Sequence, residues 1–388
     1  MYQFTLVVMI LAGILAGGCS AADPVQQKPA ELPQGYLADR IPDDADILFV
    51  SIRYVLSGSE CLDDTFNTKK NFINDPACNK KIYDPASDAL ASPRQIYSLD
   101  RESSLSVQLT NLECDFSSIK SIDTTRIMAI GMCSDTNGDG KINTMDEPEI
   151  HILNLAKKEV ECLTCDLDLR AINNPDYSLA NQMILFSAQW SDSFHNYLFT
   201  LDLEKNLSQI TFSADYMDFD CSWSEDGTKI VFSRLPAPFF SQPSQVWLMN
   251  ADSGSQEKIT DGGSNPENEE SHGPYPIGID ADPDLSPDNS QIVFSRLRTG
   301  QLNQPFGIYE LVVVDLITNE ISILDSVFAN MVPEWKEGGI LFIRQIGSTE
   351  NALDVKQGMY VYNNGLFENL EVDFDVFPIG SNGASWIE

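Results

Sequence analysis

Basic residues are scarce in this chain. It has 24 Lys and Arg against 58 Asp and Glu, which gives a formal net charge of −34 at pH 7. A surface with this charge repels the phosphate backbone, which argues against a nucleic acid as partner. Cations and basic protein surfaces are better suited to it, although acidity on this scale also serves solubility alone.

Residues that commonly carry catalysis are scarce too. Only three histidines are present, His151, His195 and His272, and there is no Gly-x-Ser-x-Gly nucleophile motif. His151 falls in a predicted strand, and His272 alone makes neither a metal site nor a triad. We therefore expect a protein that is not an enzyme. A hydrolase or lyase that acts on glycans or peptides at a central pocket is the alternative, and ligand binding without turnover is a third possibility.

Long apolar runs are limited to Leu6–Ala16, which is too short for a membrane span and is followed by small residues and Cys19. The ending Leu15-Ala-Gly-Gly-Cys19 resembles the lipobox of bacterial lipoproteins, in which the cysteine is lipidated after cleavage. Two departures, the absence of a basic residue before the run and Ala16 in place of leucine, leave ordinary secretion as the alternative. We predict a signal peptide over 1–18, a lipidated tether over 19–43, and an extracytoplasmic location on a bacterial membrane.

The chain is rich in one short strand pattern, Ile-x-Phe or a close relative of it. Six copies begin at Ile47, Ile127, Ile184, Ile230, Ile292 and Ile340. Around the clearest copy, a first strand ends at Trp223, a polar turn covers 225–228 and a second strand covers 230–233. A third strand follows at 245–249 and a fourth begins at Lys258. Four short strands cannot bury both faces of their sheet alone, so the repeats must pack on one another.

The repeat resembles that of TolB-type β-propellers, whose signature is Trp-Ser-Pro-Asp-Gly-x-x-Ile-x-Phe-Ser. The match is nearly complete at Trp223–Ser233 and close at Leu285–Ser295, and it extends from about Asp46 to the C-terminus. The resemblance implies an all-β fold with a single propeller over 44–388. It does not extend to TolB itself, because the short stretch between Cys19 and the first strand leaves no room for the α/β domain that TolB carries before its propeller.

Six four-stranded blades are the expected number. The N-terminal part supplies the second, third and fourth strands of one blade at 46–53, 95–100 and 104–110, and Phe374–Gly380 supplies its first strand. Strands from both ends would then close the ring and remove two exposed sheet edges. Under the seven-bladed alternative, Ala384–Ile387 is a further second strand.

The connections between strands differ in length. Turns between first and second strands and between third and fourth strands are short. The long connections are Tyr54–Arg94, Cys133–Glu149, Leu235–Ser244, Asp261–Asp282, Leu297–Phe306 and Gln345–Lys356. All of them join second to third or fourth to first strands, which the propeller resemblance places on one face. We expect binding residues on this face, although neutral decoration is the alternative.

One of these loops carries a metal-binding pattern. Carboxylates and amides occupy positions 1, 3, 5, 9 and 12, as Asp135, Asn137, Asp139, Asn143 and Asp146. Gly140 at position 6 permits a sharp turn, and Lys141 at position 7 offers its carbonyl oxygen. The loop resembles an EF-hand calcium loop, but Asp146 replaces the usual glutamate and strands, not helices, flank it. We predict a Ca²⁺ site here, with a calcium-free acidic turn as the alternative.

Eight cysteines in an exported chain indicate disulfides. Lipidation of Cys19 would leave seven. The predicted pairs are Cys61–Cys78, Cys114–Cys133 and Cys162–Cys165. For the last pair we favour a structural bridge over redox catalysis because no helix follows to lower a thiol pKa. Cys221 would remain as a buried thiol.

Together these features predict a non-catalytic, lipid-anchored propeller. Its acidic, calcium-stabilised face would bind another envelope protein or a surface polymer, and the lipid would be its only attachment to the membrane. Propellers also occur among enzymes, so the fold by itself does not decide this function.

Overall fold

A computed structural model describes residues 32–53, 83–84, 89–90, 94–140, 142, 145–238, 242–262, 279–298, 308–346, 356–370, 376–378 and 384–387. The compact unit begins at Gln34, ahead of the boundary expected at 44. Leu37 and Ile41 are buried in its core, and β1 (Tyr36–Leu37) pairs with β7 (Thr110–Asn111). Several predicted residues lie outside the described ones. They are Cys19, Cys61, Cys78, Lys141, Asn143 and His272.

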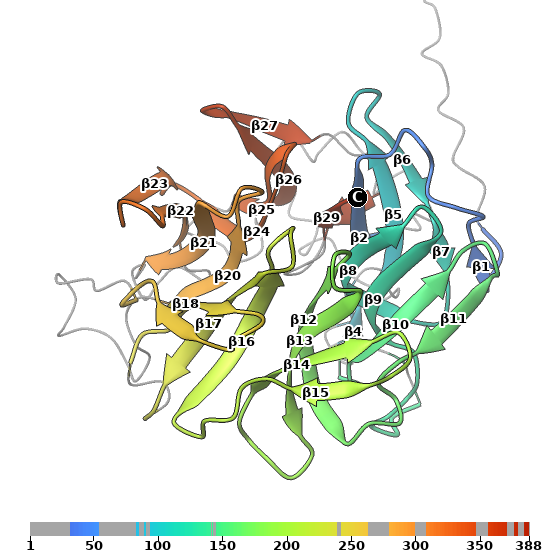
Figure 1. The fold of residues 1–388 in the computed structure, drawn as a ribbon. Coiled ribbons are helices and arrows are strands. Elements are labelled where there is room, and N and C mark those ends of the chain that lie inside the picture. The colour runs from blue at the N-terminus through green and yellow to red at the C-terminus, as the bar shows by residue number, and fades with distance from the viewer. Residues whose placement is uncertain are drawn as a thin grey trace, which may run out of the picture. The chain divides into compact units, whose positions relative to one another are not determined.

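The described strands form six blades of a β-propeller arranged in a ring (Figure 1). Blade 1 contains β28 (Val376–Pro378), β29 (Ala384–Trp386), β2 (Ile47–Arg53), β5 (Gln95–Asp100) and β6 (Leu105–Gln108). Blade 2 contains β8 (Asp115–Asp123), β9 (Arg126–Met132), β10 (Glu149–Asn154) and β11 (Glu159–Cys162). Blade 3 contains β12 (Leu169–Ser178), β13 (Met183–Trp190), β14 (Tyr197–Asp202) and β15 (Leu207–Gln209).

The remaining three blades follow the same order along the chain. Blade 4 contains β16 (Tyr216–Trp223), β17 (Lys229–Pro236), β18 (Gln245–Asn250) and β19 (Gln256–Lys258). Blade 5 contains β20 (Asp280–Leu285), β21 (Gln291–Arg298), β22 (Ile308–Asp315) and β23 (Ile321–Asp325). Blade 6 contains β24 (Ala329–Lys336), β25 (Gly339–Ile346), β26 (Lys356–Asn363) and β27 (Leu366–Leu370). A separate pair, β3 (Tyr83–Asp84) and β4 (Ala89–Leu90), lies between β2 and β5 in the chain.

The repeated Ile-x-Phe pattern forms the second strand of every blade and fills the spaces between blades. Ile230 and Phe232 of β17 share a hydrophobic cluster with Leu185 of blade 3. Val231, between them, belongs to the next cluster with Ile292 of blade 5. Successive side chains of a strand point to opposite faces, so each second strand contributes to two cores. This explains why the pattern reads as a continuous apolar run.

Three second strands carry an arginine two residues after the phenylalanine, at Arg234, Arg296 and Arg344. Each guanidinium carbon lies 4.9 to 5.2 Å from the centroid of that ring. A residue of the neighbouring first strand accepts a hydrogen bond from each guanidinium group. These bonds are Arg234 to Asp218 at 2.6 Å, Arg296 to Asp280 at 2.7 Å and Arg344 to Asn330 at 2.9 Å. These stacked arginines therefore tie the first two strands of a blade together.

Both ends of the described chain meet in blade 1 and close the ring. β28 pairs with the end of β2, and β29 pairs with its beginning. Trp386 lies opposite Ile47, as Trp335 lies opposite Ile340 in blade 6. Residues 384–386 are thus part of the closing first strand, and the alternative that made them the second strand of a seventh blade is wrong.

Candidate functional site

The innermost strands of the blades converge on a polar centre. One position on each of them, directly before the residue that pairs with the isoleucine of the second strand, faces this centre. These six residues, which we call the central ring, are Lys120, Asp176, Ser222, Asp284, Glu334 and Ser385. All but Ser385 line a pocket of about 70 Å³, room for only a few water molecules.

Hydrogen bonds run around the central ring from blade to blade. Asp176 accepts the backbone N–H of Trp223 at 2.7 Å, and Asp284 accepts that of Trp335 at 2.6 Å. The hydroxyl of Ser222 lies 2.5 Å from Asp284 and 3.2 Å from Asp176. Asp176 and Asp284 thereby satisfy a backbone donor of the following blade, so the ring joins neighbouring sheets at their inner edge.

Lys120 is the cation of the central ring. Its Nζ lies 2.9 Å from Glu334 and 3.5 Å from Asp176. Burial lowers the pKa of Lys120, but attraction from Glu334, Asp176 and Asp284 outweighs this effect and raises it overall. Burial raises the pKa of Asp284 to about 6, against the opposing effect of Lys120. The ring therefore sets one cation against three carboxyl groups, those of Asp176, Asp284 and Glu334.

A second tier of residues lies two positions before the ring in blades 3 to 6. Its members, all with left-handed backbone (φ 47° to 53°), are Asn174, Asp220, Asp282 and Val332. Each lies where the register of the first strand shifts, which identifies a β-bulge repeated in four blades. The bulge turns a polar side chain toward the pocket in three of them.

Asp220 and Asp282 of this tier form an acidic pair. The amide of Asn174 donates to Asp220, whose other oxygen lies 3.5 Å from the backbone N–H of Asp282. Burial, followed by repulsion from Asp282, raises the pKa of Asp220 well above its usual range. Burial also raises the pKa of Asp282 to about 6. Two carboxyl groups this close and this buried do not both ionise readily at neutral pH.

The sequence did not reveal the central ring. Asp280 pairs with Arg296, whereas Asp282 and Asp284 face the pocket. The signal was present as a polar residue directly before an aromatic or leucine in the first strand of every blade except blade 2, where Lys120 precedes Ser121. It includes Ser385 before Trp386, which matches Ser222 before Trp223.

The predicted calcium loop connects β9 and β10, as the sequence indicated. Asp135 accepts the backbone N–H groups of Gly138 (2.7 Å), Asp139 (3.1 Å) and Gly140 (2.7 Å). Gly140 has φ +82°, a conformation that other residues rarely adopt. Asp135, Asn137 and Asp139 are exposed, so oxygens of this short segment are open to an ion. Hard carboxylate and amide oxygens fit the ligand preference of Ca²⁺.

Asp146, at the twelfth position of the loop, turns back to its beginning. Its carboxylate accepts the backbone N–H groups of Thr136 at 2.8 Å and Asn137 at 3.2 Å, and the side chain is buried. The Thr136 hydroxyl in turn accepts the N–H of Glu147 at 2.8 Å. These bonds close the loop across its base. Of the predicted ligands, those at 135, 137, 139 and 146 lie in the described residues.

Solved structures with similar folds include propeller proteins. A protein assigned as TolB from Agrobacterium tumefaciens has a TM-score of 0.51 and 16% identity, over 72% of this chain and 89% of that one. TolB from Acinetobacter baumannii has a TM-score of 0.49 and 15% identity, over 89% of this chain and 68% of that one. An oligogalacturonate lyase from Vibrio parahaemolyticus has a TM-score of 0.43 and 12% identity, over 64% of this chain and 68% of that one. No protein-family model and no curated protein matches the chain.

The chain has a TolB-like propeller fold. At these identities the likeness extends to the fold alone. It confirms the propeller that the sequence predicted.

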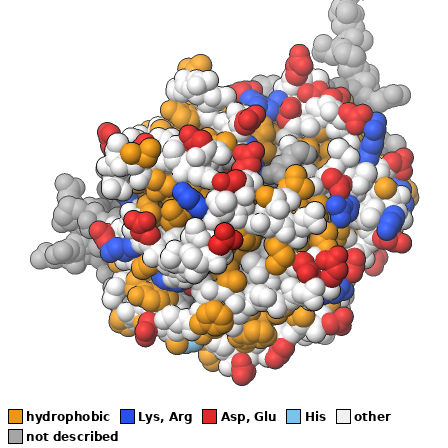
Figure 2. Space-filling view, in the orientation of Figure 1, with side chains coloured by type: hydrophobic (Ala, Val, Ile, Leu, Met, Phe, Trp, Pro, Cys, Tyr) orange, Lys and Arg blue, Asp and Glu red, His pale blue; other side chains and the backbone are white. Residues whose placement is uncertain are grey.

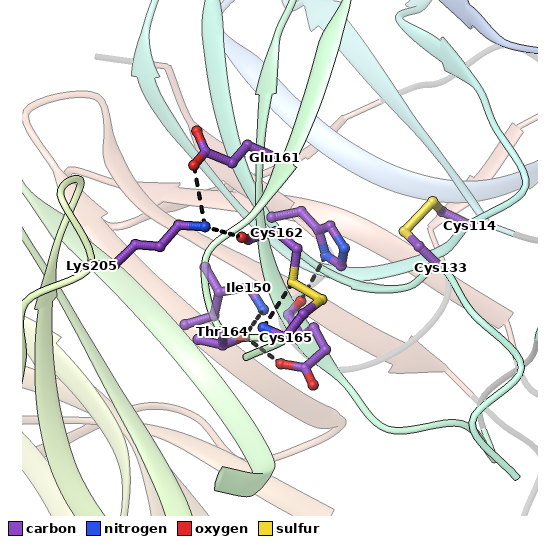
Figure 3. The surroundings of a disulfide bond; sticks show 10 residues. Cys114, Cys133, Ile150, Glu161, Cys162, Thr164, Cys165 and Lys205 are labelled. Atoms are coloured by element: carbon purple, nitrogen blue, oxygen red, sulfur yellow. Dashed lines mark hydrogen bonds and ion pairs between the residues drawn. A yellow bond between two sulfur atoms is a disulfide. The ribbon is translucent and has the colours of Figure 1, made fainter. Parts of the chain in front are cut away.

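Two disulfides lie at one end of blade 2 of the TolB-like propeller (Figure 3). Cys114 is bonded to Cys133 and Cys162 to Cys165, the two pairs predicted in this part of the chain. Cys221 is a buried thiol, and burial raises its pKa well above its usual range. Disulfides are typical of oxidising compartments, which indicates an extracytoplasmic protein.

The surface of the TolB-like propeller is predominantly acidic. Figure 2 shows Asp and Glu side chains spread over the visible face, with few Lys and Arg between them. Among the residues that the structure describes, there is no helix long and apolar enough to cross a membrane.

Proposed function

We propose that this TolB-like propeller is an exported, lipid-anchored and non-catalytic scaffold that binds an envelope protein or a surface polymer. The unequal length of its connections carries this proposal. The second-to-third connection spans 133–148 in blade 2 and 299–307 in blade 5, whereas the first-to-second turn spans 124–125 and 286–290 in the same blades. Long connections on a rigid scaffold are where binding residues usually lie.

The central pocket supports a non-catalytic role. The pocket is small, at about 70 Å³. Lys120, Asp176 and Asp284 are bonded to one another or to backbone groups of neighbouring blades. Groups engaged in this way stabilise the ring and are not free to react with a substrate.

Export and anchoring are supported by the two disulfides and by the sequence before the propeller. The run that ends in Leu15-Ala-Gly-Gly-Cys19 supplies a signal peptide and a lipid attachment site, and 19–33 would connect the lipid to the compact unit. Calcium at Asp135, Asn137 and Asp139 would fix the β9–β10 loop in one conformation and lower the negative charge of the binding face.

Affinity capture from native envelopes tests this function. The wild-type protein should retain one or a few partners in Ca²⁺ and lose them in chelator. Asp135→Ala/Asp139→Ala should lose the same partners even in Ca²⁺. Asp226→Ala/Asp288→Ala, which changes two short turns on the opposite face, is the matched control and should retain them. Partners that are retained equally by all three proteins would contradict binding through the long-loop face.

A propeller hydrolase or lyase is the second candidate. The observation in its favour is that five carboxyl groups line the pocket, two of them with a pKa raised to about 6, which suits proton transfer near neutral pH. Turnover of oligosaccharides or peptides by the purified protein, abolished by Asp284→Asn and not by Asp252→Asn, would support the enzyme and overturn the non-catalytic proposal.

A further inference from the structure

A histidine and a cysteine pair lie together at the outer edge of blade 2. His151 of β10 is the direct cross-strand partner of Cys162 of β11, so both side chains project from the same face of the sheet. Cys165 follows Cys162 after a two-residue turn. One ring nitrogen of His151 and the two sulfurs all lie within 4.8 Å of one another. The three side chains are therefore close enough to reach one metal ion once the disulfide is open.

The surroundings of these three side chains resemble the supporting shell of a metal site. Nδ1 of His151 lies 3.1 Å from the carbonyl oxygen of Glu149, and a carbonyl only accepts, so Nδ1 carries the proton of the neutral ring. The lone pair is then on Nε2. Histidine ligands commonly donate their other N–H to a backbone carbonyl in this manner. His151 is only 4% exposed, and its hydrogen bond to the Glu149 carbonyl holds the imidazole in one orientation.

The cysteine turn also suits a bound metal. The backbone N–H of Cys165 points at the sulfur of Cys162, 3.0 Å away, which stabilises negative charge on that sulfur. Lys205 binds the Cys162 carbonyl at 2.8 Å and is paired with Glu161, which holds the end of β11 in place (Figure 3). Cys165 is exposed, so an ion can enter from solvent.

We propose that Cys162, Cys165 and His151 form a redox-gated binding site for Zn²⁺, closed in the disulfide form and open in the dithiol form. Two thiolates and one imidazole are ligands that Zn²⁺ prefers, and water completes a tetrahedral set. The Cα atoms of the two cysteines are 5.8 Å apart, which accommodates thiolates about 3.8 Å apart around one Zn²⁺ ion.

A dithiol reductant gives two electrons and two protons to the Cys162–Cys165 bond; the S–S bond breaks, two thiols form, and the reductant becomes a disulfide. Binding of Zn²⁺ then displaces both thiol protons into water. In the reverse direction a disulfide oxidant takes two electrons from the two thiolates and two protons from water and becomes a dithiol; the Cys162–Cys165 bond re-forms and the ion is released.

Metal titration of the reduced full-length protein tests the proposal. After reduction with a phosphine, the wild type should bind one more equivalent of Zn²⁺ than Cys162→Ser/Cys165→Ser, which measures binding to all other thiols. With Co²⁺ as a probe, the same equivalent should show sulfur-to-metal charge-transfer absorption. The oxidised wild type should lack it. Equal stoichiometry in the two reduced proteins, or the same binding in the oxidised protein, would overturn the site.

Two further variants separate a ligand from a structural residue. His151→Gln should weaken this equivalent at least about tenfold, whereas His195→Gln, a histidine in blade 3, should leave it unchanged. Cys114→Ser/Cys133→Ser should still bind the extra equivalent of Zn²⁺. Loss of that equivalent in this variant would place the ion at Cys114 and Cys133 and contradict the proposed site. Thermal melting of each oxidised variant shows whether it is folded, and a folded His151→Gln protein with undiminished affinity would remove His151 from the site.

Discussion

The central ring and the Asp135–Asp146 loop both contain several acidic side chains, but they are assembled in opposite ways. The ring takes one residue from each blade, and its members are far apart in the sequence. The loop takes its oxygens from one short segment. In the ring, Asp176 and Asp284 are buried and accept backbone N–H groups of the next blade, whereas Asp135 accepts N–H groups of its own loop and, like Asn137 and Asp139, is exposed to solvent. Acidic residues therefore serve cohesion at the centre and remain available to a ligand at the rim.

The largest effect should follow from breaking the ring. Asp284→Ala removes the acceptor of the Trp335 N–H and of the Ser222 hydroxyl and takes one carboxylate from the environment of Lys120. We expect a loss of about 4 kcal/mol in the free energy of unfolding, because a buried charged partner is removed. Denaturant unfolding measures it. Asp252→Ala, at an exposed turn, should change stability by less than about 0.5 kcal/mol.

At the rim, removal of one ligand should abolish a calcium effect without affecting the fold. In Ca²⁺ at about one hundred times Kd, the wild type should gain about 2.7 kcal/mol of stability over the protein in chelator. Asp135→Ala should lose most of this gain, and Asp226→Ala on the opposite face should keep it. Thermal melting with and without Ca²⁺ makes the comparison. A melting temperature of the wild type that does not respond to Ca²⁺ would remove the calcium site.

Removal of a charge from the acidic pair, Asp220 and Asp282, should raise the free energy of unfolding instead of lowering it. The pKa values of Asp220 and Asp282 are raised in the folded protein, so their contribution to stability is complete below pH 4 and is lost as pH rises through about 6. Asp220→Asn should therefore stabilise the protein at pH 7 by on the order of 1 to 2 kcal/mol, with no gain at pH 3. Asp252→Asn is the control. Unfolding curves that give a gain independent of pH would contradict the pairing of these two groups.

The smallest effect should come from a backbone change in the loop. Gly140→Ala places a side chain in open space, so only its left-handed backbone is strained, at about 1 kcal/mol. Calcium affinity should fall about fivefold, because the exposed loop can relax this strain without Ca²⁺ and must take it up again to bind the ion. Gly35→Ala is a matched control, with φ +80° and equally open space. It should leave the calcium affinity of the wild type unchanged. Isothermal titration compares the two affinities.

The architecture was predictable from the sequence because its signal is local. Both faces of each second strand are buried, so Ile-x-Phe recurs with little disturbance, as at Ile230 and Ile292. Cys114 and Cys133 lie at neighbouring ends of two antiparallel strands, which made their pairing predictable as well.

The central ring was not predictable in the same way, since it depends on register. Asp176, Ser222 and Asp284 come together only because a bulge shifts each first strand by the same amount. A polar residue in a strand gives no sign of whether it faces solvent or five other blades. Ser385 was missed because the strand that contains it is short and follows β28 on the same partner.

The closure of blade 1 has a consequence for the folding of the chain. Trp386 packs in the same hydrophobic cluster as Phe49 and Leu341, and it joins residues from the two extremes of the propeller sequence. Contacts of such long separation form slowly and late. While the chain folds, the second strand of blade 1 keeps an unpaired edge until residues 384–386 pair with it. The open ring is then exposed to edge-to-edge pairing with other chains, so the last few residues protect the whole molecule from aggregation.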